Sequence, residues 1–214
     1  MTGPLVATPA GETSVPGARW SPNQEAMRTR VAQAAARLVA RAGIAGCTIR
    51  AVADEAGLTK STVHYYVDNA GELVDLAVLT FLQQFAEQVR ARMDAAPDGR
   101  EALGVLVRTF LPPAAVAAAP DDRARLNSLN LWTSYLAHAW PRGVDAEVLS
   151  CFETIRALFE TALDRCGVPD AEERARAVHL YLLGAVQHNI MRPLPGPEVA
   201  RAVEALSGVA LDLT

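Results

Sequence analysis

Residues 48–67, TIRAVADEAGLTKSTVHYYV, contain the pattern that decides the fold. Small and apolar residues recur there at the spacing of two short helices that pack on each other. They are Val52, Ala53, Ala56, Leu58, Val63 and Tyr66. Gly57 marks the break, and Thr48 and Thr59 stand where an N-cap hydroxyl accepts a free amide proton of the first helical turn. The stretch therefore predicts a helix-turn-helix.

The outward side of the second helix carries Lys60, Ser61, Thr62, His64 and Tyr65. A cation, hydroxyls, an imidazole and a phenol can all form hydrogen bonds with phosphates or with base edges in a major groove. The pattern therefore indicates contact with double-stranded DNA. Two short amphipathic helices also occur in helical proteins that never bind DNA, so the rest of the chain has to support this interpretation.

The charge of the 214-residue chain is distributed unevenly along its length. Residues 19–67 hold seven basic and three acidic side chains, whereas residues 68–214 hold thirteen basic and twenty acidic ones. A basic head on an acidic body would confine attraction for phosphate to one end of the molecule. An ordinary solvated surface is the alternative explanation for an excess of this size.

Other compositional features exclude several classes of protein. Three cysteines without zinc-type spacing predict reduced thiols in a cytoplasmic protein, with no metal and no cofactor. Residues 1–19 are rich in Pro, Gly and Thr and predict a disordered N-terminal arm, neither a signal peptide nor a membrane anchor. No later segment has the apolar length of a membrane span.

The remaining sequence predicts helices only, so the expected fold class is all-α. Ser21, Pro22 and Gln24 form a helix start with an N-cap, a proline in the first turn and a capping-box partner, and Gly43 closes that helix. Asn69 starts a long helix that joins head to body. That helix is expected at residues 70–95, and further helices at residues 100–111, 122–140, 144–166, 171–191 and 197–211, with breaks at Pro, Gly or Asp.

Three N-terminal helices followed by a larger helical body resemble the TetR family of transcriptional regulators. The match is closest over residues 46–73, GCTIRAVADEAGLTKSTVHYYVDNAGEL, and in the body it is one of helix order. The resemblance implies a helix-turn-helix DNA-binding domain at residues 20–68. It also implies a helical ligand-binding and dimerisation domain, an antiparallel bundle, at residues 69–214.

The resemblance also implies which residues contact DNA. Lys60, Ser61, Thr62 and Tyr65 are expected at base edges and sugar-phosphate, and Arg50 at a guanine or a phosphate. The residues expected to fix the backbone register, together with the helix N-terminal amides, are Thr48, Thr59, His64 and Tyr66. Two positions depart from the family pattern: Ala70 stands where a phosphate-binding Lys is common, and His64 where Tyr is common.

A ligand cavity is predicted in the body. Residues 126–140, LNSLNLWTSYLAHAW, lack ionised side chains but contain polar ones, and aromatic cavities with a few hydrogen-bonding groups typically bind small molecules. The candidate lining residues are Phe81, Phe85, Phe110, Trp132, Tyr135, His138 and Phe152. A well-packed core helix is the alternative, because aromatic side chains at helical spacing are mostly core.

The last two helices are apolar on more than one side, which favours a homodimer built from four helices. The candidate interface residues are Val178, Leu182, Gly184, Ala185, Val199, Val203 and Leu206. Two-fold symmetry would place two recognition helices roughly 34 Å apart, on a palindromic operator. A self-contained bundle with a buried central helix is the alternative.

These predictions combine into a ligand-responsive repressor, a homodimer that a small-molecule effector releases from operator DNA. A helical enzyme with His138 or His188 as base is a rival hypothesis, but the sequence lacks the common catalytic motifs. A dimeric regulator whose body binds a protein partner is a third hypothesis, which thermal shifts with small molecules would distinguish from the first.

Overall fold

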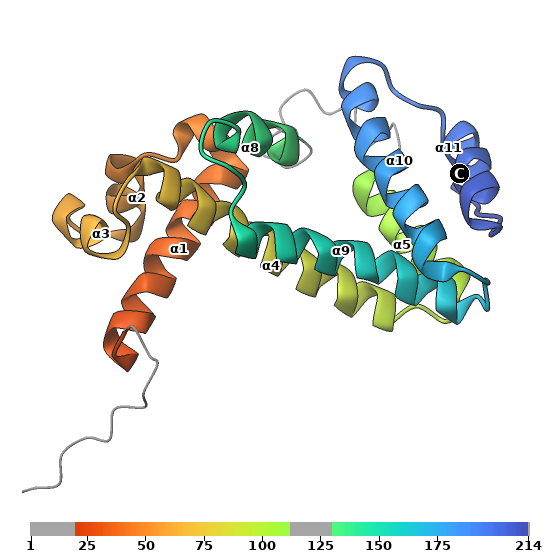
Figure 1. Cartoon of the computed structure of the whole chain (residues 1–214), viewed down its shortest axis with the longest axis horizontal. Coiled ribbons are helices and arrows are strands. Elements are labelled where there is room, and N and C mark those ends of the chain that lie inside the picture. The colour runs from red at the N-terminus through yellow and green to blue at the C-terminus, as the bar shows by residue number, and fades with distance from the viewer. Residues whose placement is uncertain (1–19, 112–129, 214) are drawn as a thin grey trace, which may run out of the picture.

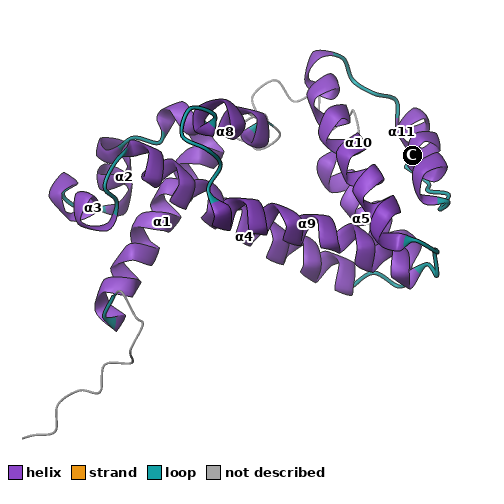
Figure 2. Ribbon diagram, viewed as in Figure 1, coloured by secondary structure: helices purple, strands orange, loops and turns teal. Residues whose placement is uncertain are grey.

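The structure is a computed structural model that describes residues 20–111 and 130–213. All regular secondary structure in these two ranges is helical (Figure 2). The all-α fold class predicted from the sequence is therefore confirmed. The predicted disordered arm at 1–19 lies outside the described residues, as does the first part of the helix predicted at 122–140.

The head consists of three α-helices and a short 3-10 turn. Its elements are α1 (Pro22–Ala42), η1 (Ile44–Gly46), α2 (Ile49–Ala56) and α3 (Lys60–Tyr66). The predicted capping box starts α1: the Gln24 amide donates to Ser21 Oγ at 3.4 Å, and the Ser21 amide donates to Gln24 Oε1 at 2.8 Å. Both predicted features of the first helix, its start and its end before Gly43, are confirmed.

The body follows the predicted order of helices. Its described elements are α4 (Ala70–Asp94), α5 (Gly99–Phe110), α8 (Leu131–Ala139), α9 (Ala146–Arg165), α10 (Ala171–Met191) and α11 (Gly196–Ser207). The last helix ends before the predicted residue 211, because Gly208 adopts the left-handed conformation at φ 77° and terminates it. None of the helices described has both the length and the apolar composition that crossing a membrane requires.

Two hydrophobic cores lie along the molecule. The first joins α1, α2 and α3 to the first half of α4, to α8 and to the start of α9. The second joins the end of α4 to α5, the rest of α9, α10 and α11. The cores therefore divide within α4, between Ala86 and Val89, and not at residue 68 where the sequence pattern changes.

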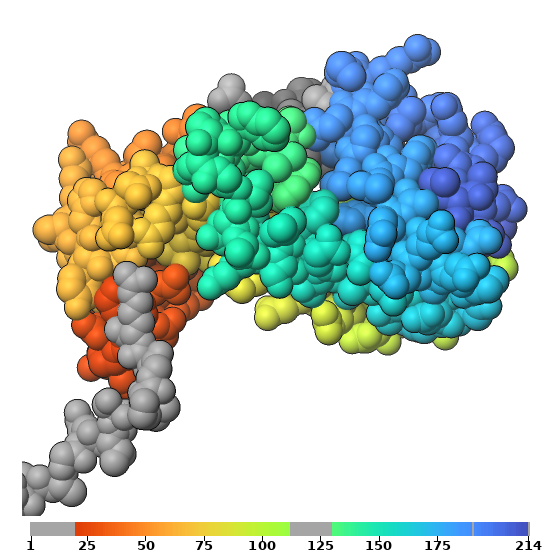
Figure 3. Space-filling model, viewed as in Figure 1, coloured from red at the N-terminus to blue at the C-terminus, as the bar shows by residue number. Residues whose placement is uncertain are grey.

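Helices α4 and α9 lie side by side along the molecule and connect the two ends (Figure 1). In the space-filling view, the head and the C-terminal helices occupy opposite ends of one continuous surface (Figure 3). Leu73 and Ala77 of α4 are fully buried against the head, where α1 also packs on α4. Each buried leucine of this kind contributes about 1.5–3 kcal/mol, so the first turns of α4 move with the head.

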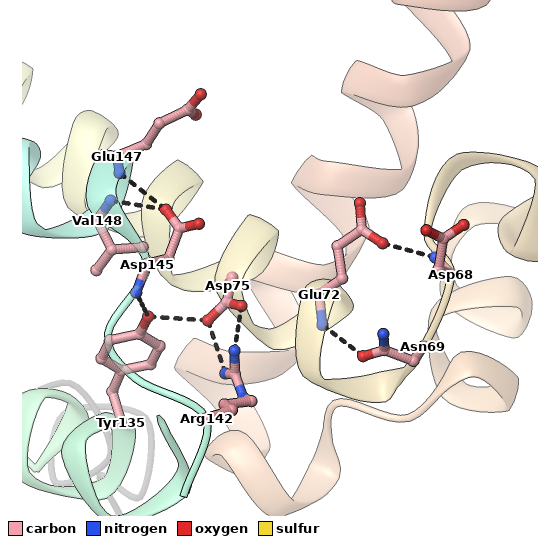
Figure 4. Close-up of polar contacts among 9 residues, drawn as sticks. All are labelled: Asp68, Asn69, Glu72, Asp75, Tyr135, Arg142, Asp145, Glu147 and Val148. Atoms are coloured by element: carbon pink, nitrogen blue, oxygen red, sulfur yellow. Dashed lines mark hydrogen bonds and ion pairs between the residues drawn. The ribbon is translucent and has the colours of Figure 1, made fainter. Parts of the chain in front are cut away.

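A polar cluster joins α4 to the segment around α8 (Figure 4). The Arg142 guanidinium donates to both oxygens of Asp75, at 2.5 and 2.7 Å, and the Tyr135 hydroxyl donates to Asp75 Oδ1 at 2.8 Å. The same hydroxyl accepts the Asp145 amide at 3.2 Å. Burial raises the pKa of the Tyr135 phenol to about 12, so the hydroxyl remains a donor at neutral pH. Bidentate Arg–carboxylate pairs of this type fix geometry as well as adding stability.

We expect Tyr135→Phe to lower the free energy of unfolding by about 1–3 kcal/mol, because the change removes the hydroxyl that accepts the Asp145 amide and leaves Asp75 Oδ1 with Arg142 as its remaining partner. Urea denaturation of the two proteins measures this loss. Tyr65→Phe is the matched control, since its hydroxyl is bonded at an exposed site and the expected change is within about 0.5 kcal/mol. Equal losses in both variants would contradict a structural role for the cluster.

Candidate functional site

The helix-turn-helix has the local geometry that its sequence predicts. Thr48 Oγ1 accepts the Ala51 amide at 3.2 Å, and Thr59 Oγ1 accepts the Thr62 amide at 3.1 Å. Gly57 adopts the left-handed conformation, φ 63° and ψ 41°, which ends α2 and turns the chain towards α3. Both predicted N-caps and the glycine turn are therefore confirmed.

Helix α3 separates its buried side from its exposed side. Val63 is fully buried and Tyr66 is only 8% exposed, so these two side chains hold α3 against the head. The opposite side presents Lys60, Ser61 and His64 to solvent, with Tyr65 57% exposed. The exposed side chains of α3 thus form a polar face with one permanent cation.

Tyr65 is held in place by the start of α1. The Gln24 amide group donates to the Tyr65 hydroxyl at 2.6 Å, and the Trp20 ring lies 5.7 Å from the Tyr65 ring, centroid to centroid. Tyr66 packs edge-on against Tyr65 at 5.0 Å. The orientation of the exposed phenol is therefore set by residues outside the helix-turn-helix.

Most arginines of α1 and α2 are engaged with carboxylates. Glu55 accepts Arg37 Nε at 3.0 Å and Arg41 Nη2 at 2.8 Å, which braces α1 against α2. The hydrogen bonds from Arg41 and then Arg37 lower the pKa of the Glu55 carboxyl, so it stays ionised. Arg50 is more loosely placed, because its Nε lies 3.9 Å from Asp54 Oδ2 and both side chains are exposed. Arg50 and Lys60, the cations of α2 and α3, are thus exposed without a close carboxylate partner among the described residues.

A cavity of about 190 Å³ lies within the body, bounded by α4, α5, α8, α9 and α10. Its aromatic wall residues are Phe81, Phe85, Phe110, Trp132 and Phe152. The polar wall residues are Thr109, Thr133, His179 and Gln187, and the aliphatic ones are Val78, Leu82, Leu131, Ile155, Leu183 and Val186. None of these described wall residues carries a formal charge.

His179 is the buried polar group of this cavity wall. It is 2% exposed, and its ring lies 4.8 Å from Phe152, 5.3 Å from Phe159 and 5.8 Å from Phe110, between centroids. Its Nε2 has no hydrogen-bond partner among the residues that the structure describes. Burial lowers the pKa of His179 to about 4, with a small opposing effect from Glu153, so the imidazole is neutral near neutral pH.

Two family models match the chain. Residues 32–75 match "Bacterial regulatory proteins, tetR family", and residues 143–209 match "Tetracyclin repressor-like, C-terminal domain". The chain belongs to the TetR family of transcriptional regulators. The first match runs from the middle of α1 through α2 and α3 to the start of α4, and therefore contains the helix-turn-helix described above. No curated protein matches the sequence.

Solved structures of regulators share the fold of this TetR-family protein. The multidrug binding protein EbrR, complexed with ethidium, is 24% identical over 87% of this chain and 99% of its own, with a TM-score of 0.59. A transcriptional regulator from Rhodococcus sp. Rha1 is 22% identical over 85% and 94%, with a TM-score of 0.57. FadR from Bacillus subtilis, in complex with stearoyl-CoA, is 15% identical over 84% and 97%, with a TM-score of 0.57.

The structure gives the exposure of each residue predicted for DNA contact, and the contacts themselves stay a prediction. Thr48, Arg50, Lys60, Ser61, His64 and Tyr65 are exposed as expected, and Thr62 is partly exposed. Tyr66 lies in the head core beside Trp20, at 5.5 Å between ring centroids, so it does not belong to the exposed face. The Thr59 hydroxyl is already bonded within α3, to Ser61 Oγ at 3.0 Å and Thr62 Oγ1 at 2.8 Å.

Five of the seven residues predicted for the ligand cavity lie on its wall: Phe81, Phe85, Phe110, Trp132 and Phe152. Tyr135 and His138 do not. Tyr135 turns towards Asp75, and His138 is exposed on the far side of α8. His179 also lies on the wall, but the sequence does not predict it there. It stands next to Val178 in an apolar run, and a lone histidine in such a run is most simply a core residue.

The residues predicted for the dimer interface lie mainly inside the protomer. Val178, Leu182 and Val203 are fully buried, Val199 is 3% exposed and Ala185 is 6% exposed. Leu206 is partly buried against the same core, and Gly184 alone is exposed. The reason is that α10 packs on α9 and α11 of its own chain. This packing covers the apolar sides of α10 and α11 that were expected to face a second copy. The outward side of α10 instead presents Leu180, which is 60% exposed, and Met191, which is 79% exposed.

The depressed pKa of His179 predicts a pH-dependent stability. The unfolded chain binds a proton as the pH falls below about 6.5, whereas the folded chain resists until about 4. The contribution of the neutral His179 to the free energy of unfolding is therefore complete above about pH 6.5 and is lost as the pH falls towards about 4. We expect wild type to lose on the order of 3 kcal/mol relative to His179→Phe across this window, measured by urea denaturation at a series of pH values. Parallel curves for the two proteins would contradict the burial of a neutral imidazole.

Proposed function

We propose that this TetR-family protein is a repressor that binds an inverted-repeat operator as a homodimer and leaves it when a small molecule occupies the body cavity. One observation carries the proposal. Helix α4 starts in the head core and, further along, supplies Phe81 and Phe85 to the cavity wall. A ligand that moves these side chains therefore acts on the helix that also holds the head. We propose regulation of transcription without catalysis.

The DNA step rests on the exposed polar face of α3. Lys60 and Arg50 supply positive charge for phosphates, and the exposed Thr48 stands at the start of α2. Ser61 and Tyr65 are exposed donors and acceptors suited to base edges. His64 takes the place of the family's common tyrosine and supplies a ring nitrogen there, while Ala70 offers no cation. Lys60 and Arg50 are then the cations of α2 and α3 that can meet a phosphate, so loss of either should lower the affinity for DNA measurably.

A second copy is proposed to cover the outward side of α10. Leu180 and Met191 are large apolar side chains on this side, and a Cβ atom at Gly184 would meet no atom within 4 Å in the single chain. A helix of the partner could approach closely there, as small residues permit. A two-fold pair of heads also suits the two half-sites of an inverted repeat. The interface proposed from the structure thus replaces the buried stripes predicted from the sequence.

The ligand step is supported by the character of the cavity and by two relatives of the same fold. EbrR was crystallised with ethidium, and FadR with stearoyl-CoA. In this chain the cavity is enclosed mainly by aromatic and aliphatic side chains, as in most small-molecule sites. A small apolar effector would therefore gain by leaving water, and its binding would release operator DNA.

The polar cluster at Asp75 offers a route from the cavity to the head. Trp132 lines the cavity, and Tyr135, three residues along α8, donates to Asp75 in the second turn of α4. The rings of Trp132 and Tyr135 lie 6.1 Å apart, centroid to centroid. A ligand that displaces Trp132 changes the position of α8 and hence its hold on α4. The shift occurs only if the ligand binds the released arrangement more tightly than the DNA-bound one.

The DNA step is tested by selecting bound fragments from random duplex DNA and then measuring the affinity for the recovered site at several salt concentrations. Wild type should recover an inverted repeat. Lys60→Ala should bind the same site more weakly, with a log–log salt slope smaller by about 0.9 for each half-site, because one phosphate contact is lost. The control is Arg90→Gln, at an exposed site on the distal half of α4, which should leave the slope unchanged. Failure of wild type to select any duplex would refute the proposed function.

The dimer is tested by Leu180→Glu, which places a charge on the proposed interface without disturbing the protomer core. Light scattering should show a dimer for wild type and a monomer for the variant, since a buried unpaired carboxylate costs several kcal/mol. Leu149→Glu is the matched control: the leucine is 49% exposed in the first turn of α9, a different helix from the proposed interface, so this variant should stay dimeric. A dimeric Leu180→Glu protein would place the interface elsewhere.

A further inference from the structure

The part of the cavity wall that the structure describes is unsuited to charged ligands. None of the described wall residues is acidic or basic, and the nearest charges that act on His179 belong to Glu153 and Arg156 of α9. Those two side chains are paired with each other, Arg156 Nε to Glu153 Oε2 at 2.7 Å. An anion or cation entering the cavity would lose its hydration without gaining an opposite charge. The described wall residues therefore favour an uncharged molecule.

Two pairs of nearly parallel rings give the wall flat surfaces. Trp132 stacks on Phe152 with 4.2 Å between centroids and 12° between planes. Phe81 and Phe85 are also stacked, at 13°. Aromatic surfaces of this type pack best against another planar ring. The volume, about 190 Å³, slightly exceeds the roughly 150 Å³ of a dry cavity that holds benzene, so one or two fused rings fit.

His179 supplies the polar contact that such a ligand would need. The Thr109 hydroxyl is already engaged: it donates to the Val105 carbonyl at 2.7 Å and accepts Arg92 at 3.2 Å. Thr133 and Gln187 are not fully buried, so water reaches them. The Nε2 atom of His179 is buried and lacks a partner among the described residues, at an energetic cost that a bound polar group would remove. A hydroxyl both donates and accepts, so it matches either tautomer of the neutral ring.

We propose that the cavity binds an uncharged, planar aromatic molecule of one or two rings whose hydroxyl group forms a hydrogen bond with His179 Nε2. This inference rests on the proposed function, because it names the chemical class of the effector for the same site. It also makes His179 the residue that distinguishes a hydroxylated ligand from a plain hydrocarbon. The aromatic wall alone would accept both.

Four bicyclic probes of nearly equal size test the inference by equilibrium dialysis against the full-length wild-type protein near neutral pH. They are 2-naphthol, naphthalene, 2-naphthoate and N-methylquinolinium. We expect 2-naphthol to bind about three- to tenfold more tightly than naphthalene, as one net hydrogen bond contributes. The anion and the cation should each bind at least about tenfold more weakly than 2-naphthol. Tighter binding of N-methylquinolinium, or no binding of 2-naphthol, would overturn the proposal.

His179→Phe isolates the contribution of the imidazole. The variant keeps a flat ring but has no ring nitrogen, so it should bind the two neutral probes equally while retaining affinity for naphthalene. His188→Phe, at an exposed site on the same helix, should keep the wild-type preference. A preference for 2-naphthol that persists in His179→Phe would overturn the role of His179. Because the wild-type probe series needs no substitution, the ligand class is tested even if His179→Phe folds poorly.

A separate measurement distinguishes this inference from the proposed function. The probe that binds most tightly is added to the protein on its selected operator. Binding of 2-naphthol without release of DNA would contradict the repressor mechanism and support the ligand class. Release of DNA by a charged probe, with 2-naphthol inert, would support the repressor and overturn the ligand class.

Discussion

The membership of α4 in both hydrophobic cores is the constraint on which the rest of the structure depends. The helix has 25 residues and is therefore about 37 Å long, enough to run from the head through the cavity wall to the far core. Leu73 and Ala77 tie its first turns to the head, while Val89 and Met93 tie its end to the body. A helix fixed at both ends transmits a displacement instead of absorbing it. This property makes a cavity near its middle relevant to DNA geometry.

Local signals made most of the fold predictable from the sequence. Ser21, Thr48 and Thr59 each cap the helix that was expected to follow them, and Gly57 turns the chain where the helix-turn-helix pattern requires. These features depend on interactions within three or four residues, so the sequence alone determines them. The exposed face of α3 followed from the same pattern, because a seven-residue helix with two buried side chains has only one side left for solvent. Tyr66 is buried as the packing pattern indicates, and Trp20, which lies outside the motif, packs beside it.

Non-local packing explains what the sequence could not provide. Helical periodicity shows that Val178 and Leu182 are buried, but it is the same whether their own chain or a second copy covers them. Tyr135 and His138 lie on one short helix, and only the position of Asp75, sixty residues earlier, decides that the phenol turns away from the cavity. His179 belongs to the cavity because four other helices, α4, α5, α8 and α9, contribute rings to the same wall. Such assignments require the arrangement of helices in space.

The contact between Gln24 and Tyr65 has a consequence for motion. A helix of seven residues is too short to persist alone, so the order of α3 depends on its neighbours. The start of α1 is one of them, through Trp20 and the Gln24 amide. Fraying of the first turn of α1 would therefore loosen the recognition segment in the same local unfolding event, and the amides of both would exchange with solvent together. Because the start of α1 already orders α3 before DNA is bound, α3 loses less conformational entropy on binding. The turn of helix that has this effect lies outside the helix-turn-helix.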